Sequence, residues 1–248
     1  PWSLILYSLL LCSDRDCMKC INCDFEFESN YCPNCGSNAT ASRISWSSVI
    51  SSTINGLTSM DKGILYNLKN LSLSPRRTIM SYIKGKRRFV FNPLSYAIVT
   101  VTIYLLLNSY FDFSISRENS EELENSNIYQ FGVETGTFLR QKIKYFWLLN
   151  ICYLAFFTWV FFRNLNYLEH LVLNAFIVGH ATVLGIITQP IYPMIVFNPF
   201  VLFYIALLIF LTLKTKGFQF LELLFAFLSV IMAYFFFIMT PMLILLLS

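Results

Sequence analysis

The chain has 248 residues, of which 56% are hydrophobic and only 13% are charged. Soluble domains have about 25% charged residues, so this composition excludes an ordinary soluble domain and predicts a mostly α-helical integral membrane protein. The net charge is +4, but residues 1–92 hold 11 basic and 6 acidic residues, whereas residues 93–248 hold 7 and 8. A basic segment ahead of an apolar one favours contact with membrane lipids, above all anionic ones, or with an acidic partner, and makes nucleic acid the weaker candidate.

Residues 1–16 are expected to be an atypical or incomplete N-terminus. The chain starts at Pro1 rather than Met, and the apolar run from Leu4 to Leu11 is short. That run lacks the basic flank and the small-residue cleavage site of a signal peptide, so we do not interpret it as one.

Five cysteines cluster within residues 17–35, and four of them form two Cys-x-x-Cys pairs separated by eight residues. Two such pairs joined by a short loop present four thiolates tetrahedrally, which is the geometry of closed structural zinc sites. We therefore predict a zinc-ribbon-like module over residues 17–37, with a structural zinc ion because four thiolates leave no open position. The predicted ligands are Cys20, Cys23, Cys32 and Cys35, with Cys17 as an alternative member of the first pair. Disulfide bonds are the other interpretation, and they require an oxidising compartment.

Residues 44–91 place apolar side chains at helical spacing among Ser, Thr and Asn, which predicts amphipathic helices. Ser74-Pro75 suits a helix start and Gly85 a helix end. We expect two or three short helices lying on the membrane surface, with a small soluble bundle packed against the spans as the alternative. The basic residues expected to bind the membrane surface are Lys84, Lys86, Arg87 and Arg88.

Residues 93–247 predict a transmembrane domain of about five helices. The predicted spans are 93–111, 143–162, 168–188, 191–213 and 218–247. The fourth is interrupted by Pro193 and by Asn198-Pro199. The last, at about 30 residues, exceeds the roughly 30 Å hydrocarbon core, so it has to tilt, project or kink near Pro241.

Basic residues between the spans predict the orientation, because cytoplasmic loops are enriched in Lys and Arg. Seven basic residues fall on one side of the membrane: Lys84, Lys86, Arg87, Arg88, Arg163, Lys214 and Lys216. Four fall on the other: Arg117, Arg140, Lys142 and Lys144. We therefore expect a multi-pass protein of the cytoplasmic membrane with a cytosolic N-terminus and an external C-terminus. A reducing cytosol is also where free thiolates bind zinc.

Several motifs occur in the order found in a known family. They are Tyr31-Cys32-Pro33-Asn34-Cys35-Gly36, Asp61-Lys62-Gly63, Tyr82-Ile83-x-Gly85-Lys86-Arg87-Arg88 and Asn92-Pro93. Together they resemble the bacterial membrane family catalogued as domain of unknown function 3667, whose members have a zinc-ribbon-like N-terminus followed by several spans. The resemblance covers roughly residues 20–104 and implies a bacterial membrane protein, but no activity, substrate or mechanism. Ser74-Pro75-Arg76 departs from the expected Pro-Gly, which affects a turn rather than the architecture.

Polar side chains within spans are energetically expensive and serve as functional hypotheses. Glu169 and His180 are eleven residues apart, so in a helix they lie on nearly one face, about 16 Å apart. Glu222 enters the last span from the same side as Glu169. These three residues form the predicted intramembrane polar site. In the structural interpretation, Glu169, His170 and Glu222 lie at headgroup depth and His180 hydrogen-bonds a neighbouring helix.

The sequence supports two functional hypotheses. The first is a membrane adaptor or assembly factor whose zinc module and basic helices bind a protein partner or anionic lipid. The second is a transporter of a small solute or lipid that uses the polar residues of the third to fifth spans, since broken helices form solute sites in transporters. We recognise no phosphate loop, nucleophile motif or open metal site, so no catalytic residue is predicted and an enzyme is not expected.

Overall fold

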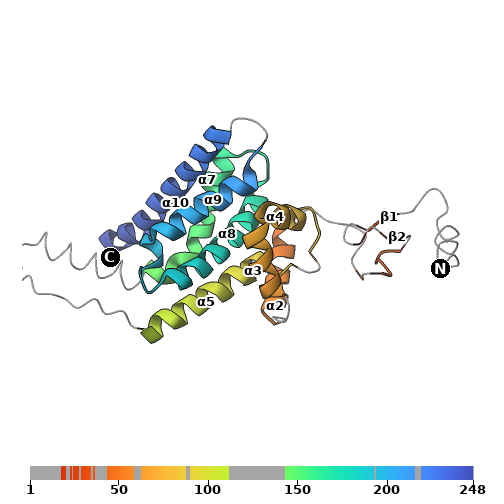
Figure 1. The fold of residues 1–248 in the computed structure, drawn as a ribbon, viewed down its shortest axis with the longest axis horizontal. Coiled ribbons are helices and arrows are strands. Elements are labelled where there is room, and N and C mark those ends of the chain that lie inside the picture. The colour runs from red at the N-terminus through yellow and green to blue at the C-terminus, as the bar shows by residue number, and fades with distance from the viewer. Residues whose placement is uncertain are drawn as a thin grey trace, which may run out of the picture. The chain divides into compact units, whose positions relative to one another are not determined.

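The computed structural model describes residues 18–20, 23, 25–27, 29–34, 36, 44–58, 63–87, 90–111, 143–192, 194–215 and 219–247. These residues are mostly helical and belong to two compact units, Pro1–Phe91 and Asn92–Ser248 (Figure 1). The predictions for residues 1–16, Cys17, Cys35, Arg88, Arg117, Arg140, Lys142, Pro193 and Lys216 lie outside the described residues.

The first unit begins with a short antiparallel hairpin of β1 (Met18–Lys19) and β2 (Glu26–Phe27). Met18 pairs with Phe27 and Lys19 with Glu26. The backbone N–H of Cys20 donates to the Phe25 carbonyl at 2.8 Å and continues this pairing. The hairpin therefore holds Cys20 directly at the end of a strand.

The described residues of the same unit then form the helices α2 (Trp46–Thr58), α3 (Gly63–Leu73) and α4 (Pro75–Ile83). Helix α4 begins at Pro75, as the sequence predicts, because a proline at the first helical position gives up an N–H that has no partner there. Gly85 follows the helix with φ of 101°, a left-handed conformation that favours glycine.

Helices α3 and α4 pack on each other, and Asn67 connects α3 to the end of the unit. The Asn67 amide donates to the Phe91 carbonyl at 3.0 Å and accepts from the Phe91 N–H at 3.1 Å. Ile79 and Tyr82 on α4 are buried within the protein. Whether these helices lie on the membrane surface or form a small bundle stays a prediction.

The second unit is a helical bundle. Its elements are α5 (Pro93–Phe111), the 3-10 helix η2 (Ile143–Leu149) continuing into α7 (Asn150–Phe161), α8 (Tyr167–Thr188), the 3-10 helix η3 (Ile195–Phe197), α9 (Pro199–Leu213) and α10 (Gln219–Leu247). Helices α7, α8, α9 and α10 each pack on the next, α10 returns to α7, and α5 packs on α8. Figure 1 shows these helices running roughly side by side. Helix α8 is buried on all faces over most of its length, which fits its apolar composition.

Three helical stretches among the described residues are long and apolar enough to cross a membrane, which indicates a membrane protein. They are Ile143–Phe161 with 19 residues, Tyr167–Thr188 with 22 and Gln219–Thr240 with 22. The apolar stretches Pro93–Ser109 and Pro199–Leu213 are shorter. Helix α9 has 15 residues, about 22 Å at 1.5 Å per residue, against a hydrocarbon core of about 30 Å. Three of the five predicted spans therefore reach membrane length.

The predicted interruption of the fourth span at Asn198-Pro199 is present. Side chains of the protein form hydrogen bonds with the backbone N–H groups next to it. The Ile195 N–H donates to the Tyr104 hydroxyl at 3.2 Å. Asn198 caps α9 by accepting from the Phe200 N–H at 3.0 Å, and its amide donates to the Thr188 hydroxyl at 2.7 Å. Irregular backbone at membrane depth is tolerated where protein buries it, and Ile195 is indeed buried.

Candidate metal centre and buried polar groups

The sulfur atoms of Cys20, Cys23 and Cys32 form a compact cluster in which all lie within 4.8 Å of one another. Cys23 Sγ and Cys32 Sγ are 3.5 Å apart. A disulfide needs about 2.05 Å, whereas two thiolates on one tetrahedral zinc lie about 3.8 Å apart when each Zn–S bond is about 2.3 Å. No disulfide joins any two of these three cysteines, and their spacing suits a metal ion.

Local backbone structure explains how the thiols meet. Cys20 directly follows β1, and Cys32 begins a tight turn in which the Gly36 N–H donates to the Cys32 carbonyl at 2.7 Å. Gly36 has φ of 67°, a conformation that costs other residues more than glycine. Phe27 packs against Cys20 and Cys32 and shields them from water. The structure thus brings together three of the four predicted ligands, and the part played by Cys35 stays a prediction.

The predicted surface-binding residues differ in their surroundings. Lys84 and Lys86 are exposed. Arg87 is partly buried, because its guanidinium lies 5.5 Å from the centre of the Tyr82 ring and its Nε donates to the Tyr82 carbonyl at 3.5 Å. Arg87 therefore packs on the end of α4, which leaves the two lysines as the described members of this set that face outward.

The structure gives Glu169, His180 and Glu222 separate local partners. Glu169 Oε2 accepts from the Asn166 N–H at 2.8 Å in a capping box that starts α8. The Glu222 carboxylate accepts from the Thr215 N–H at 2.9 Å and from the Thr215 hydroxyl. Both carboxylates thus satisfy backbone donors next to helix starts.

His180 lies in the interior and connects helices. Its Nδ1 is 3.2 Å from the Tyr96 hydroxyl on α5, and its ring centre is 5.8 Å from that of Tyr204 on α9. Gly179 allows this approach, because a Cβ there would lie 2.8 Å from Tyr96 Cδ1 and 3.0 Å from Ala97 Cα. These contacts fit the structural interpretation of His180, in which small residues and interhelical hydrogen bonds join membrane helices.

The structure shows a buried network around His170, whereas the structural interpretation of the sequence placed this residue at headgroup depth and predicted no network. His170 is fully buried, with Nδ1 at 3.1 Å from the Thr158 hydroxyl and Nε2 at 2.8 Å from the Phe162 carbonyl. The Asn174 amide donates to the same Thr158 hydroxyl at 2.9 Å. The sequence does contain a signal for this network. His170, Asn174 and Thr182 are separated by four and eight residues, so they lie along one side of a helix.

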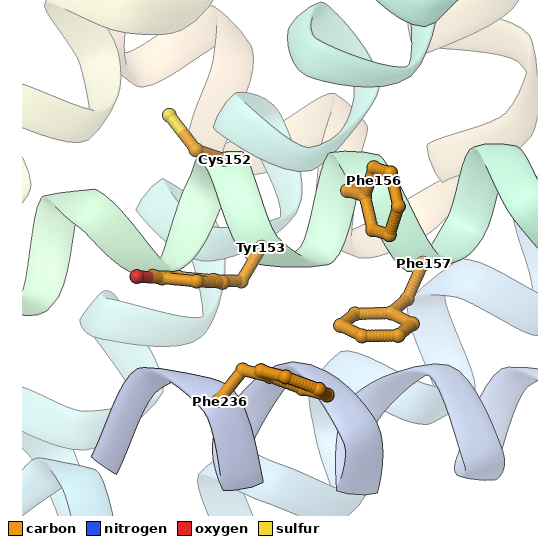
Figure 2. Close-up of a pocket in the computed structure, with 5 residues that line it drawn as sticks. All are labelled: Cys152, Tyr153, Phe156, Phe157 and Phe236. Atoms are coloured by element: carbon orange, nitrogen blue, oxygen red, sulfur yellow. The ribbon is translucent and has the colours of Figure 1, made fainter. Parts of the chain in front are cut away.

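A shallow apolar groove of about 310 Å³ lies between α7 and α10. Figure 2 shows the residues that line it, which are Cys152, Tyr153, Phe156, Phe157 and Phe236. The Phe157 and Phe236 ring centres are 5.4 Å apart, and the Tyr153 hydroxyl hydrogen-bonds Thr240 at 2.6 Å. Because its one hydroxyl already has a partner, the groove presents hydrocarbon and fits apolar groups.

No family model matches the chain, and no curated protein or solved structure matches it. The resemblance to the family catalogued as domain of unknown function 3667 therefore stays a prediction. Fold and sites define a helical protein with three membrane-length apolar helices and a three-cysteine cluster able to hold a metal ion.

Proposed function

We propose that this protein is a bacterial cytoplasmic-membrane adaptor or assembly factor with a cytosolic zinc module and a basic, lipid-binding juxtamembrane segment. The proposal rests on two features that occur in the same unit. One is the three-thiol cluster, and the other is an exposed apolar helix face in a strongly basic segment. The multi-pass topology with the N-terminus in the cytosol is part of the same proposal.

Helix α2 supplies the apolar face. Trp46, Ile50 and Ile54 are 55%, 57% and 61% exposed at four-residue spacing, whereas Val49 is buried. Residues four apart share a helix face, so these side chains form one stripe. Trp and aliphatic side chains on one face are typical of helices that bind the membrane interface.

Charge supports an anionic lipid surface as the partner of this face. Residues 44–91 contain eight basic residues, namely Lys62, Lys69, Arg76, Arg77, Lys84, Lys86, Arg87 and Arg88, and one acidic residue, Asp61. The exposed ones among the described residues include Lys69, Arg76 and Arg77. Each basic residue near an anionic surface contributes about 1 kcal/mol.

The thiol cluster supports zinc as the metal. Thiolate ligands select soft metals, and four-thiolate sites with Cys-x-x-Cys pairs are typical of zinc. Such a site is closed, so its role is to fold the module, with apparent binding free energy on the order of 10 kcal/mol. The folded module then offers a rigid surface to a protein partner.

The transporter hypothesis has less support. Its main feature, the break before α9, is occupied by Ile195 and Val196, both 1% exposed. The Tyr104 hydroxyl and Asn198 satisfy the neighbouring polar groups. Because these polar groups already form hydrogen bonds within the protein, few of them remain to bind a solute.

Native mass spectrometry of the full chain, extracted from membranes of mixed lipid, tests the lipid-binding part of the proposal. The variant Lys84→Gln, Lys86→Gln, Arg88→Gln loses three charges, so we expect about hundredfold weaker retention of anionic lipid. The control variant Lys84→Arg, Lys86→Arg, Arg88→Lys keeps the charge and should retain lipid as the native protein does. Equal retention by the Gln variant and the control would reject the basic segment as a lipid site.

A further inference from the structure

The apolar groove between α7 and α10 lies on the outside of the bundle, between two of the membrane-length stretches. Phe156 and Phe236 on its walls are 48% and 47% exposed, so the described part of the chain leaves these rings uncovered. Figure 2 shows the rings of Phe157 and Phe236 facing each other between the two helices. In a membrane protein, a surface of this kind meets the hydrocarbon of the lipid.

A line of side chains continues the groove toward the end of α7. Cys152, Phe156 and Trp159 are separated by four and three residues, so they follow one face of the helix. The Phe156 and Trp159 ring centres are 6.5 Å apart, and the guanidinium of Arg163 lies 4.5 Å from the centre of the Trp159 ring. Phe161, where α7 ends, comes nine residues after Cys152, which is about 14 Å of helix. The line therefore has the length of one leaflet, which is half of a hydrocarbon core of about 30 Å.

Arg163 gives this end of the line a positive charge. It is exposed, and it is the only charged residue in the sequence from 145 to 168. Trp and Arg side chains at the end of a membrane helix lie at the level of the lipid headgroups, and a guanidinium binds phosphate through paired hydrogen bonds. The next acidic residue, Glu169, accepts from the Asn166 N–H. The charge at this end thus complements an anionic headgroup.

The arrangement of rings and charge selects the class of ligand. An apolar groove one leaflet long fits an acyl chain, and a cation beside its headgroup end fits a phosphate. A choline or ethanolamine group would bring a second positive charge close to Arg163, so a headgroup without its own cation fits better.

We propose that the α7–α10 groove binds one anionic glycerophospholipid, with an acyl chain in the groove and the phosphate at Arg163, beside Trp159. The orientation predicted from the basic residues assigns this lipid to the cytoplasmic leaflet. The site belongs to the second unit and uses neither the zinc module nor the basic segment of residues 44–91. Its failure therefore leaves the proposed function intact.

Photocrosslinking of the full chain in phosphatidylcholine vesicles tests this site. The probe is a phosphatidylglycerol that carries a diazirine on one acyl chain, and the labelled residues are identified by mass spectrometry. Labelling of residues 152–157 should saturate as the fraction of probe rises, and unlabelled phosphatidylglycerol should compete with it. The matched control is α9, where Phe200 and Phe203 are 51% and 58% exposed and labelling should rise without saturation.

Two results of this experiment would overturn the proposal. If labelling of the groove rises without saturation, as on α9, the groove meets only bulk lipid. If its labelling stays below that of α9 at every fraction of probe, a second copy of the chain covers the groove.

Substitutions at Arg163 test the position of the headgroup in the same assay. Arg163→Gln should lower the labelling of residues 152–157 about fivefold at low probe, because one basic residue near the anionic group is lost. Arg163→Lys keeps the charge and should retain most of the labelling. Equal labelling of these two variants would contradict the phosphate site.

The variant Lys84→Gln, Lys86→Gln, Arg88→Gln separates this site from the lipid-binding segment of the proposed function. It should leave the labelling of the groove unchanged. A loss of groove labelling in this variant, with none in Arg163→Gln, would assign the lipid to the basic segment and overturn the proposal.

Discussion

Individual residues in this bundle act mainly through helix contacts and caps. The Asn166–Glu169 capping box starts α8, Asn198 caps α9, and Gly179 lets α5 approach α8. The sequence reveals that Glu169 and His180 are polar residues in an apolar run. It does not reveal their partners. Helical spacing shows on which face of its own helix a residue lies, but it does not show which other helix packs against that face.

Gly179→Ala should destabilise the protein by about 1–3 kcal/mol. The added Cβ would lie 2.8 Å from Tyr96 Cδ1 and 3.0 Å from the backbone Cα of Ala97, and a packed backbone cannot shift cheaply. Gly185→Ala is the matched control, because its Cβ meets the flexible end of Ile195 at 2.7 Å. Thermal unfolding in detergent should show the larger loss for Gly179→Ala, and equal effects would contradict the close α5–α8 contact.

Glu169→Gln should keep near-native stability, because an amide oxygen can accept the Asn166 N–H as the carboxylate does. Glu169→Ala should lose about 0.3–1.5 kcal/mol. The comparison uses unfolding of both variants under identical conditions. If Glu169→Ala is as stable as Glu169→Gln, the capping role is wrong.

At the scale of elements, the sequence predicts starts and interruptions well and membrane crossing less well. Pro75, Pro93 and Pro199 each begin a helix, and the break before α9 includes the predicted Asn198-Pro199. Helix α5 covers the predicted residues 93–111, whereas α9 has only 15 residues. The short length of α9 was not predictable, because apolar residues continue on both sides of the break before it. The partners of His170, Thr158 and Phe162, were not predictable, because they come from another helix.

The metal site is an element-scale prediction. Purified protein should contain one zinc ion per chain, and Cys20→Ser with Cys32→Ser should remove it, because these sulfurs belong to the compact cluster. Cys152→Ser is the matched control, since this thiol lies in the apolar groove of the bundle. Elemental analysis of reduced protein that finds no zinc, or the same zinc in the double variant, would reject the site.

At the scale of the whole molecule, the chain consists of a basic, cysteine-containing first unit and an apolar helical bundle. The bundle accounts for the 56% hydrophobic content, and the basic excess is concentrated before residue 93. Because cytoplasmic loops are enriched in Lys and Arg, the basic excess predicts that the N-terminal segment lies in the cytosol. The composition alone predicts this division. It does not predict that α8 packs at the centre of the bundle, because that position is set by contacts between helices.

Cysteine labelling of intact cells tests the predicted orientation. A membrane-impermeant reagent should modify a cysteine introduced near Glu122 and spare one introduced near Lys62, with the site of modification read by mass spectrometry. Permeabilised cells, in which both positions react, serve as the control. The reverse pattern would contradict the orientation derived from the basic residues.

Quantitative affinity capture of the full chain from its native membranes tests the adaptor role most directly. Three proteins are compared at matched abundance: the native chain, the variant Cys20→Ser with Cys32→Ser, and the variant Glu169→Gln with His180→Ala. The account predicts that the cysteine variant loses the proteins bound to the native chain, because the zinc module presents the docking surface, whereas the span variant keeps them. Retention by the cysteine variant together with loss by the span variant would contradict the account and favour a function within the bundle.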